Sequence, residues 1–305
     1  MFDNIVGNKA AKKTLKKAVE LNKVSHSYMF VGISGIGKRL IAKEFAKMLL
    51  CLDDNKYCNK CKSCLEFDSS NNPDYIYIEP DEKGSIKIDQ IRNMQKEVSE
   101  KPIISSNKVC IINDADMMTV EAQNCLLKTL EEPPTYMTIV LIGTNESNFL
   151  ATIKSRCTIM YFERISDEEI TSFLSENFQG QTIGSNITEI ADGSIAKAIN
   201  LKDKTGTYEK ITNIIDNLEN CDIIHILKEA ENLYKEKDEI FEILDYMNVL
   251  LIKKAINSSK YANCIEIIEE TKKRIKSNSN YNMCIDYMLF GIWGEVNEKH
   301  SRSKI

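Results

Sequence analysis

The sequence predicts an α/β domain built on a parallel sheet and followed by all-helical domains. Between residues 27 and 143, short apolar runs typical of buried strands alternate with stretches of helical periodicity. Such alternation indicates a parallel sheet with helices on both faces. Beyond residue 161 no further run has the character of a buried strand, and a capping sequence at Ser166 opens a series of amphipathic helices.

Periodicity places the predicted elements along the chain. A lysine-rich amphipathic helix is expected first, over residues 9–22. After it we expect strands over 27–31, 75–78, 108–112 and 137–143, and helices over 39–50, 88–100 and 120–131.

The change of character near residue 161 divides the chain into three predicted domains. The first contains the sheet (1–162) and includes a cysteine-rich insert (51–72). A small helical domain (163–205) and a larger helical domain (206–305) complete the chain. The charged stretch 202–207 is predicted to link the last two.

Composition excludes some classes of protein. The 305 residues carry a net charge of −5, which argues against binding nucleic acid by bulk electrostatic attraction. The sequence has neither an apolar signal region nor an apolar run of roughly 18 residues, so a cytoplasmic location is expected. Ten cysteines without an export signal favour metal binding or free buried thiols over disulfides.

A predicted strand, the sequence GISGIGKRL and a predicted helix follow one another, which is the order found at a phosphate-binding loop. The pattern Gly-x-x-x-x-Gly-Lys is complete at Gly32, Gly37 and Lys38, and Gly35 adds to the cradle. The next position, where a serine or threonine hydroxyl would hold Mg²⁺, is Arg39. A guanidinium has no lone pair to donate, so Arg39 cannot be a magnesium ligand.

A second defect is expected at the acidic element of the same site. The strand over 108–112 is followed by Asn113 and Asp114, where a nucleotide hydrolase has an Asp-Glu pair. Asn113 then places a neutral amide where the magnesium-binding acid would be. Asp114, one methylene shorter than glutamate, takes the position of the acid that polarises water. Loss of a placed acid or base costs about 10² to 10⁴ in rate, so hydrolysis is not expected. The sequence leaves open whether the loop still binds nucleotide or phosphate.

The insert contains four cysteines in a polar segment that has too few apolar residues to fold by packing alone. They are Cys51, Cys58, Cys61 and Cys64. Four thiolates suit a tetrahedral zinc ion with a structural role and no catalytic one. An iron–sulfur cluster is the alternative, although the Cys-Pro expected in bacterial cluster motifs is absent. Four unliganded cysteines are the least favoured interpretation.

Two further segments carry a resemblance to a known family. Residues 122–134 read AQNCLLKTLEEPP, and Ser155-Arg156-Cys157 comes shortly after them. With the four-cysteine insert, they resemble the signature motifs of bacterial sliding-clamp loaders, the AAA+ subunits of DNA polymerase III. The resemblance runs from Phe2 to about Leu201. It implies an AAA+ domain with a zinc module, then a helical lid, and it is consistent with a helical collar domain at the end.

Two kinds of subunit in this family share the layout, the ATP-hydrolysing tau/gamma type and the delta-prime type. Arg39 and Asn113 depart from the hydrolysing type, and Ala196 stands where that type has a nucleotide-sensing arginine. Thr144 occupies the position of the family's sensor threonine. These departures resemble the delta-prime type.

The intact Ser-Arg-Cys motif implies a role in trans for Arg156. In the family it acts as an arginine finger at the ATP site of a neighbouring subunit. The implied partners are tau/gamma and delta subunits in a ring that loads the sliding clamp on primed DNA, with no ATP hydrolysis at this chain's own site. Two alternatives are an ATP-hydrolysing motor subunit and a zinc-dependent nucleic-acid-binding protein.

Overall fold

The computed structural model describes residue 2 and residues 4–178, 187–203, 205–220, 222–237 and 239–297. It divides into two compact units, Met1–Ile199 and Asn200–Ile305. Of the predicted helical domains, residues 179–186, 204, 221, 238 and 298–305 lie outside the described residues.

The N-terminal unit is built on one sheet, which in the described part of the chain has five parallel strands in the order β2-β3-β4-β1-β5. The strands are β1 (Ser27–Val31), β2 (Tyr75–Ile78), β3 (Lys108–Ile112), β4 (Met137–Gly143) and β5 (Thr158–Tyr161). The predicted parallel sheet and its first four strands are therefore confirmed.

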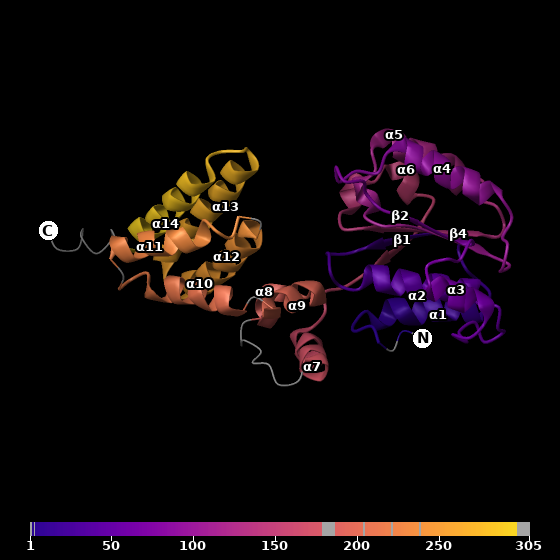
Figure 1. Ribbon diagram of the computed structural model, residues 1–305, viewed down its shortest axis with the longest axis horizontal. Coiled ribbons are helices and arrows are strands. Elements are labelled where there is room, and N and C mark those ends of the chain that lie inside the picture. Colours follow the sequence, from indigo (N-terminus) through magenta and orange to yellow (C-terminus); the bar gives the residue numbers. More distant parts are fainter. Residues whose placement is uncertain are drawn as a thin grey trace. The chain divides into compact units, whose positions relative to one another are not determined.

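Helices cover both faces of this sheet (Figure 1). One face carries α1 (Lys9–Glu20), α2 (Lys38–Leu50) and α3 (Lys62–Asp68), and the other carries α4 (Ile88–Ser99), α5 (Val120–Glu131) and α6 (Ala151–Lys154). Short 3₁₀ turns η1 (Ala115–Met117) and η2 (Glu146–Asn148) follow β3 and β4. The unit continues with α7 (Asp167–Asn177), α8 (Ile187–Ala191) and the start of α9 (Ile195–Asp203).

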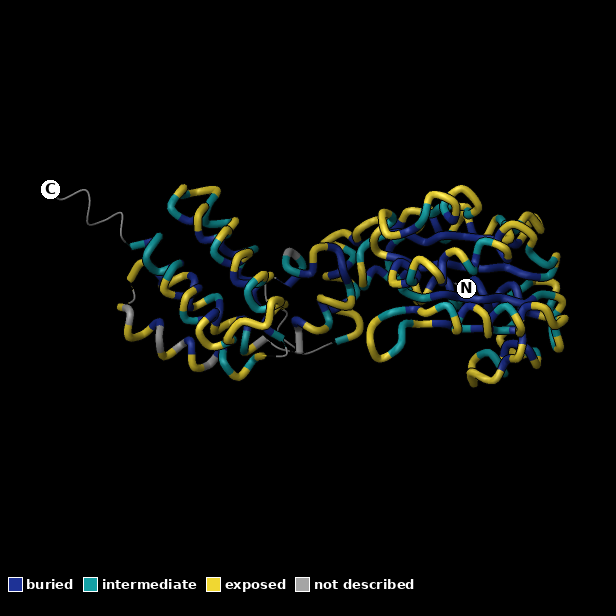
Figure 2. Tube along the Cα trace, turned by 90° about the horizontal axis from the view of Figure 1, so that it is seen from above, coloured by how far each residue is buried: buried dark blue, intermediate teal, exposed yellow. Residues whose placement is uncertain are grey.

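The three central strands are apolar because they lie between two layers of helices. Every residue of β1, β3 and β4 is buried, and Figure 2 shows these strands in the dark blue of the core. Their parallel register brings the carboxyl ends to one edge, with Val31 opposite Gly143 and Ile112 opposite Leu141. The loops after β1, β3 and β4 consequently meet at that edge, where ligands bind in open α/β sheets.

Three local expectations were wrong or incomplete. The sequence did not predict β5, an edge strand of four residues beside β1 whose side chains are exposed or half-buried. Arg156 therefore lies just before the last strand of the sheet. The insert contains α3, and Lys47 of α2 anchors this helix through an ion pair of 2.7 Å with Asp68. The stretch 202–207 is largely helical, because α9 extends to Asp203 and the next helix begins at Thr205.

The described residues of the C-terminal unit form helices joined by turns and contain no strand. The unit contains α10 (Thr205–Asn217), α11 (Ile223–Leu233), α12 (Ile240–Asn257), the turn η3 (Ser259–Tyr261), α13 (Ala262–Lys276) and α14 (Tyr281–Asn297). Its core is formed by apolar side chains such as Leu244, Leu251, Ile268 and Met288. None of the helices in the described part of the chain combines the length and apolar character that crossing a membrane requires.

Candidate functional site

The loop after β1 has the backbone of a phosphate-binding loop. Gly35 and Gly37 have φ angles of 79° and 91°, which glycine adopts without strain. A Cβ atom on Gly35 would lie 2.1 Å from the Ser194 hydroxyl oxygen, so the close approach of the two segments also requires glycine. Gly37 precedes the first turn of α2, which directs the helix N-terminus and its free N–H groups at the loop.

Lys38, the first residue of α2, points back along this loop. Its Nζ donates hydrogen bonds to the carbonyl oxygens of Gly32 at 2.5 Å and Ile33 at 2.7 Å. Burial lowers the pKa of the ammonium group, while the nearby Asp114 and Asp116 act to raise it. An ammonium has three donors, so one N–H direction is still available to an anion in the loop.

Arg39 places a permanent cation at the position where the sequence pattern predicts a magnesium-binding hydroxyl. Its side chain is exposed, and the guanidinium carbon lies 5.0 Å from the ring centroid of Tyr77 on β2. This separation is within the range of a cation–π contact. The geometry agrees with the sequence argument that position 39 offers no ligand to a metal ion.

The acids after β3 are arranged differently from a hydrolase pair. The Asn113 side-chain amide donates to Asp114 Oδ2 at 2.8 Å, and Asp114 has a φ of 47°. Burial raises the pKa of Asp114, as does the neighbouring Asp116, while Lys38 and Arg39 act to lower it. The Asn113 amide thus uses one acceptor site of the Asp114 carboxylate.

Sequence reasoning missed Asp116, a buried residue of η1. Its Oδ2 accepts three hydrogen bonds from the end of β4: from the Thr144 N–H at 3.0 Å, the Thr144 hydroxyl at 2.8 Å and the Asn145 N–H at 3.0 Å. An acid two residues beyond Asp114 was visible in the sequence, but nothing local indicated its partners 28 residues away. Asp116 joins the loops that follow two adjacent strands.

These elements surround a pocket of about 430 Å³. All the positions predicted for the nucleotide site except Gly32 line it: Gly35, Gly37, Lys38, Arg39, Asn113, Asp114, Thr144 and Ala196. The remaining wall is largely apolar and includes Ile5, Ile142 and Phe173. Ala196 at the start of α9 contributes no side-chain polar group, and its N–H donates to the Gly35 carbonyl oxygen at 3.2 Å. The structure therefore gathers the predicted positions in one place, and their roles stay predictions.

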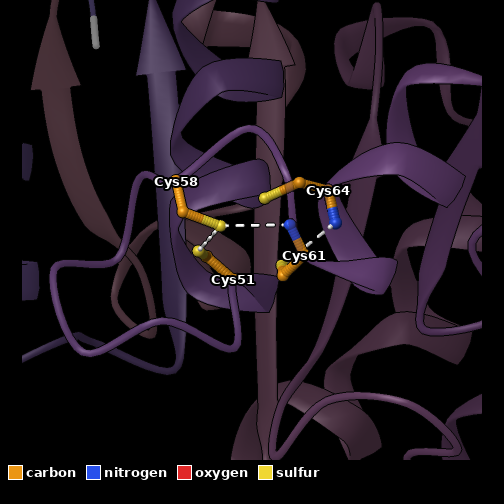
Figure 3. Close-up of side chains that lie close together, drawn as sticks. All are labelled: Cys51, Cys58, Cys61 and Cys64. Carbon is orange, nitrogen blue, oxygen red and sulfur yellow. Dashed lines mark hydrogen bonds between the residues drawn. The ribbon is translucent and has the colours of Figure 1, made fainter.

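The four cysteines of the insert also come together (Figure 3). All four sulfur atoms lie within 4.8 Å of one another, and those of Cys51 and Cys58 are 3.6 Å apart. Four sulfurs about 2.3 Å from a tetrahedral zinc ion would be roughly 3.8 Å apart, so the cluster fits zinc. The cluster is formed by Cys51 at the end of α2, Cys58 in the loop, Cys61 at the cap of α3 and Cys64 within α3.

Backbone N–H groups around the cluster favour the thiolate form of Cys61, whereas burial raises the pKa of Cys51 and Cys64. The Cys61 N–H donates to the Cys58 sulfur at 3.3 Å, and the Cys64 N–H donates to the Cys61 sulfur at 3.5 Å. Burial acts to raise the pKa of Cys61, but the N–H groups of Leu52 and Cys64 and the neighbouring thiols lower it to about 6. A thiolate is the form that binds a metal, so these residues can hold a metal ion together.

Arg156 occupies the turn between α6 and β5, away from the pocket residues named above. Its Nη2 lies 2.7 Å from Oε1 of Glu131, the last residue of α5, and about a third of its side chain is exposed. The Ser27 hydroxyl on β1 donates to its carbonyl oxygen at 2.5 Å. The motif is therefore fixed to the sheet, and its guanidinium lies at the surface.

A parallel sheet with a glycine loop after its first strand, and with acids after a neighbouring strand, defines the class of P-loop nucleotide-binding domains. The solved structure of a DNA polymerase III gamma-subunit-related protein from Thermotoga maritima has the same fold. It covers 94% of this chain and 99% of its own, with a TM-score of 0.52 and 18% identity.

Sequence comparison narrows this class to one family. The family model described as DNA polymerase III, delta subunit, matches residues 7–166. The chain is 31% identical to the tau subunit of DNA polymerase III from Bacillus subtilis over 262 residues, which is 82% of this chain and 46% of that protein. It is 38% identical to the delta' subunit from the same organism over 165 residues, 54% of this chain and 50% of that one.

The chain belongs to the family of DNA polymerase III clamp-loader subunits. Among the curated relatives are both tau/gamma and delta' subunits, and the comparison does not separate the two types. The chain spans between about a third and a half of the length of the tau and tau/gamma relatives.

Proposed function

We propose that this chain is a clamp-loader subunit of the delta-prime type, which hydrolyses no ATP at its own site. The observation that carries the proposal is the magnesium side of the pocket. Arg39 and Asn113 both line it, where hydrolysis requires a hydroxyl and a carboxylate. Ala196 adds a third loss, because a methyl group cannot contact a phosphate.

Arg156 is the group that acts, and it acts in trans. Its motif is intact, and its guanidinium lies at the surface with about a third of the side chain exposed. An arginine supplied to a neighbouring ATP site stabilises charge on the transferring phosphoryl group and raises the rate by about 10³ to 10⁵. The partners are tau/gamma and delta subunits, and through their ring the sliding clamp and primed DNA.

The remaining parts have supporting roles. Residues 163–205 form the lid and residues 206–305 the collar through which subunits associate. The four cysteines hold a structural zinc ion that stabilises the insert. None of these three parts requires nucleotide turnover by this chain.

One titration tests the central claim. The purified chain is mixed with a fluorescent ATP analogue, with and without Mg²⁺, while phosphate release is followed. We expect no hydrolysis and either weak binding or binding that Mg²⁺ does not strengthen. Lys38→Ala is the control that shows whether any signal comes from this loop. Magnesium-dependent turnover that Lys38→Ala abolishes would contradict the proposal.

The motor-subunit alternative rests on the retained loop glycines and Lys38, and on the extensive similarity to a tau subunit. This alternative predicts magnesium-dependent ATP turnover by the isolated chain, so the same titration decides between it and the delta-prime proposal. The nucleic-acid-binding alternative predicts salt-sensitive DNA binding by the isolated chain, and its net charge of −5 makes it the weakest of the three.

A further inference from the structure

The Arg156 side chain is held by three contacts. Its Nη1 donates to the Thr152 carbonyl oxygen at 2.9 Å and to the Ser155 hydroxyl oxygen at 3.3 Å. Its Nη2 lies 2.7 Å from Glu131 Oε1. A guanidinium has five N–H donors, so these contacts leave two for an incoming anion. The group is thus oriented while part of it stays available.

Glu131 is the contact that comes from a separate element. Thr152 in α6 and Ser155 in the turn that follows it lie within four residues of Arg156 along the chain, so they do not fix it relative to another element. Glu131 is the C-terminal residue of α5, so its carboxylate fixes the guanidinium relative to the body of the sheet domain. The Ser27 hydroxyl does the same for the Arg156 backbone through its bond to the carbonyl oxygen.

The position of Glu131 is unfavourable for the helix itself. The C-terminus of a helix carries a partial negative charge, and an acid there is destabilising unless a cation compensates. Arg156 supplies that cation. The next residue, Glu132, is also exposed, and it forms no ion pair within the described part of the chain.

We propose that Glu131 is a positioning residue for Arg156, and that it sets the guanidinium in the orientation that a neighbouring ATP site requires. This inference rests on the proposed function of Arg156 in trans. An arginine has many rotamers, and a group misplaced by about 1 Å can lose about 10²-fold in rate. Removing Glu131 therefore lowers turnover at the neighbouring site although Glu131 itself touches no nucleotide.

The test uses the full chain assembled with tau/gamma and delta subunits of the same organism. The tau/gamma subunits carry alanine in place of their own Ser-Arg-Cys arginine, so DNA-stimulated ATP turnover reports the site that Arg156 serves. For Glu131→Ala we expect a loss of about 10- to 100-fold in kcat with the ATP KM within about twofold of wild type. Glu131→Gln keeps an oxygen acceptor and retains part of the activity. Glu132→Ala is the matched control and behaves as wild type.

A double variant shows whether Glu131 acts through Arg156. Glu131→Ala combined with Arg156→Ala is expected to be no less active than Arg156→Ala alone, because the removed contact has no other purpose. Gel filtration of each assembly shows that all variants still form the ring, and a variant that does not assemble is replaced by Glu131→Gln.

The outcomes separate the two claims. If Arg156→Ala lowers turnover but Glu131→Ala does not, the positioning role is wrong and the finger stands. If Glu131→Ala raises turnover, Glu131 restrains Arg156 instead of positioning it, and the inference is again wrong. If Arg156→Ala leaves turnover unchanged, both the finger and the positioning role are wrong.

Discussion

The Thr144 hydroxyl donates a hydrogen bond of 2.8 Å to the carboxylate of Asp116, and so ties the end of β4 to the turn after β3. Two backbone N–H groups, those of Thr144 and Asn145, share the same carboxylate oxygen. Asp116 is only 8% exposed. One buried acid therefore ties together the loops after β3 and β4, two of the segments that line the pocket.

Replacing Asp116 by alanine should destabilise the N-terminal unit. Three donors lose their acceptor in a nearly buried site, and unsatisfied buried donors cost about 1 to 3 kcal/mol each, less where water enters. We expect the free energy of unfolding of this unit to fall by about 2 to 4 kcal/mol. Urea unfolding followed by far-UV circular dichroism measures it.

Two comparisons control this experiment. Glu82→Ala removes a carboxylate from an exposed loop residue and should change the midpoint little. The lone tryptophan, Trp293, lies in α14, so its fluorescence reports the C-terminal unit. A variant Asp116→Ala as stable as Glu82→Ala would show that the network contributes nothing.

Removing the charge of Asp114 should have the opposite effect and stabilise the N-terminal unit. Its folded pKa is raised above 3.8, chiefly because burial disfavours the charged form and Asp116 lies nearby. The ionised group therefore lowers stability at neutral pH. This cost shrinks as the pH falls through the raised folded pKa, and it is absent below the unfolded pKa of about 3.9.

The variant Asp114→Asn cannot ionise and tolerates the φ of 47° at this position. It retains an oxygen that can accept from the Asn113 amide. We expect a higher urea midpoint than wild type at pH 7 and an equal one near pH 3. A lower midpoint at pH 7, or a difference that does not change with pH, would show that burial of the charge is not what raises this pKa.

The cysteine cluster can be tested by metal content. We expect about one colourless zinc ion per chain, and replacement by Co²⁺ should give the strong visible absorption of tetrahedral cobalt thiolate. Cys64→Ser should weaken zinc binding by at least about 100-fold, since it removes a ligand and not merely an outer-shell contact. Acid should release the metal because the thiolates become protonated.

Cys125→Ser is the matched control, because Cys125 is half-buried and lies outside the cluster. It should bind zinc as the wild type does. A brown protein that contains iron and sulfide would instead support the iron–sulfur alternative. A chain that retains its fold and binds no metal would show that the four thiols are unliganded.

The sequence was sufficient wherever a short local pattern determined the outcome. Three of the four predicted strands are buried runs between two layers of helices, the fourth, β2, alternates buried and half-buried residues, and the glycine loop has its own signature. The edge strand β5 was missed because its four residues are exposed or half-buried and carry no apolar period. The prediction of a linker over 202–207 was wrong. The charged residues and the glycine there suggested a break in the helices, whereas α9 extends to Asp203.

The contacts that hold the site depend on the tertiary fold. Asp116 and Thr144 are 28 residues apart, and Glu131 and Arg156 are 25 apart, so neither pair has a local period. Each joins loops or helix ends that only the parallel sheet brings together. Sequence alone can identify the chemistry at these positions but not which partners hold it.

Restoring the magnesium side of the pocket gives the most direct test of why the chain would not hydrolyse ATP. Arg39→Thr supplies a hydroxyl in the first turn of α2, and Asn113→Asp supplies a carboxylate after β3. Both are hard oxygen ligands of the kind that Mg²⁺ binds. With both changes we expect ATP affinity to rise by at least about tenfold on addition of Mg²⁺. The ion can then contact both the protein and the phosphates, whereas in the wild type the Arg39 guanidinium repels it.

Each single variant should gain less than the pair, because one ligand alone leaves the ion poorly held. Adding Lys38→Ala to the double variant should abolish the gain, since it removes the ammonium that lies within the loop. Fluorescence titration with an ATP analogue measures all four proteins. If the double variant gains no magnesium dependence, the residues at positions 39 and 113 are not what prevents magnesium-dependent ATP binding. The next feature to test is the hydrogen bond from the Ala196 N–H to the Gly35 carbonyl oxygen, which ties α9 to the loop.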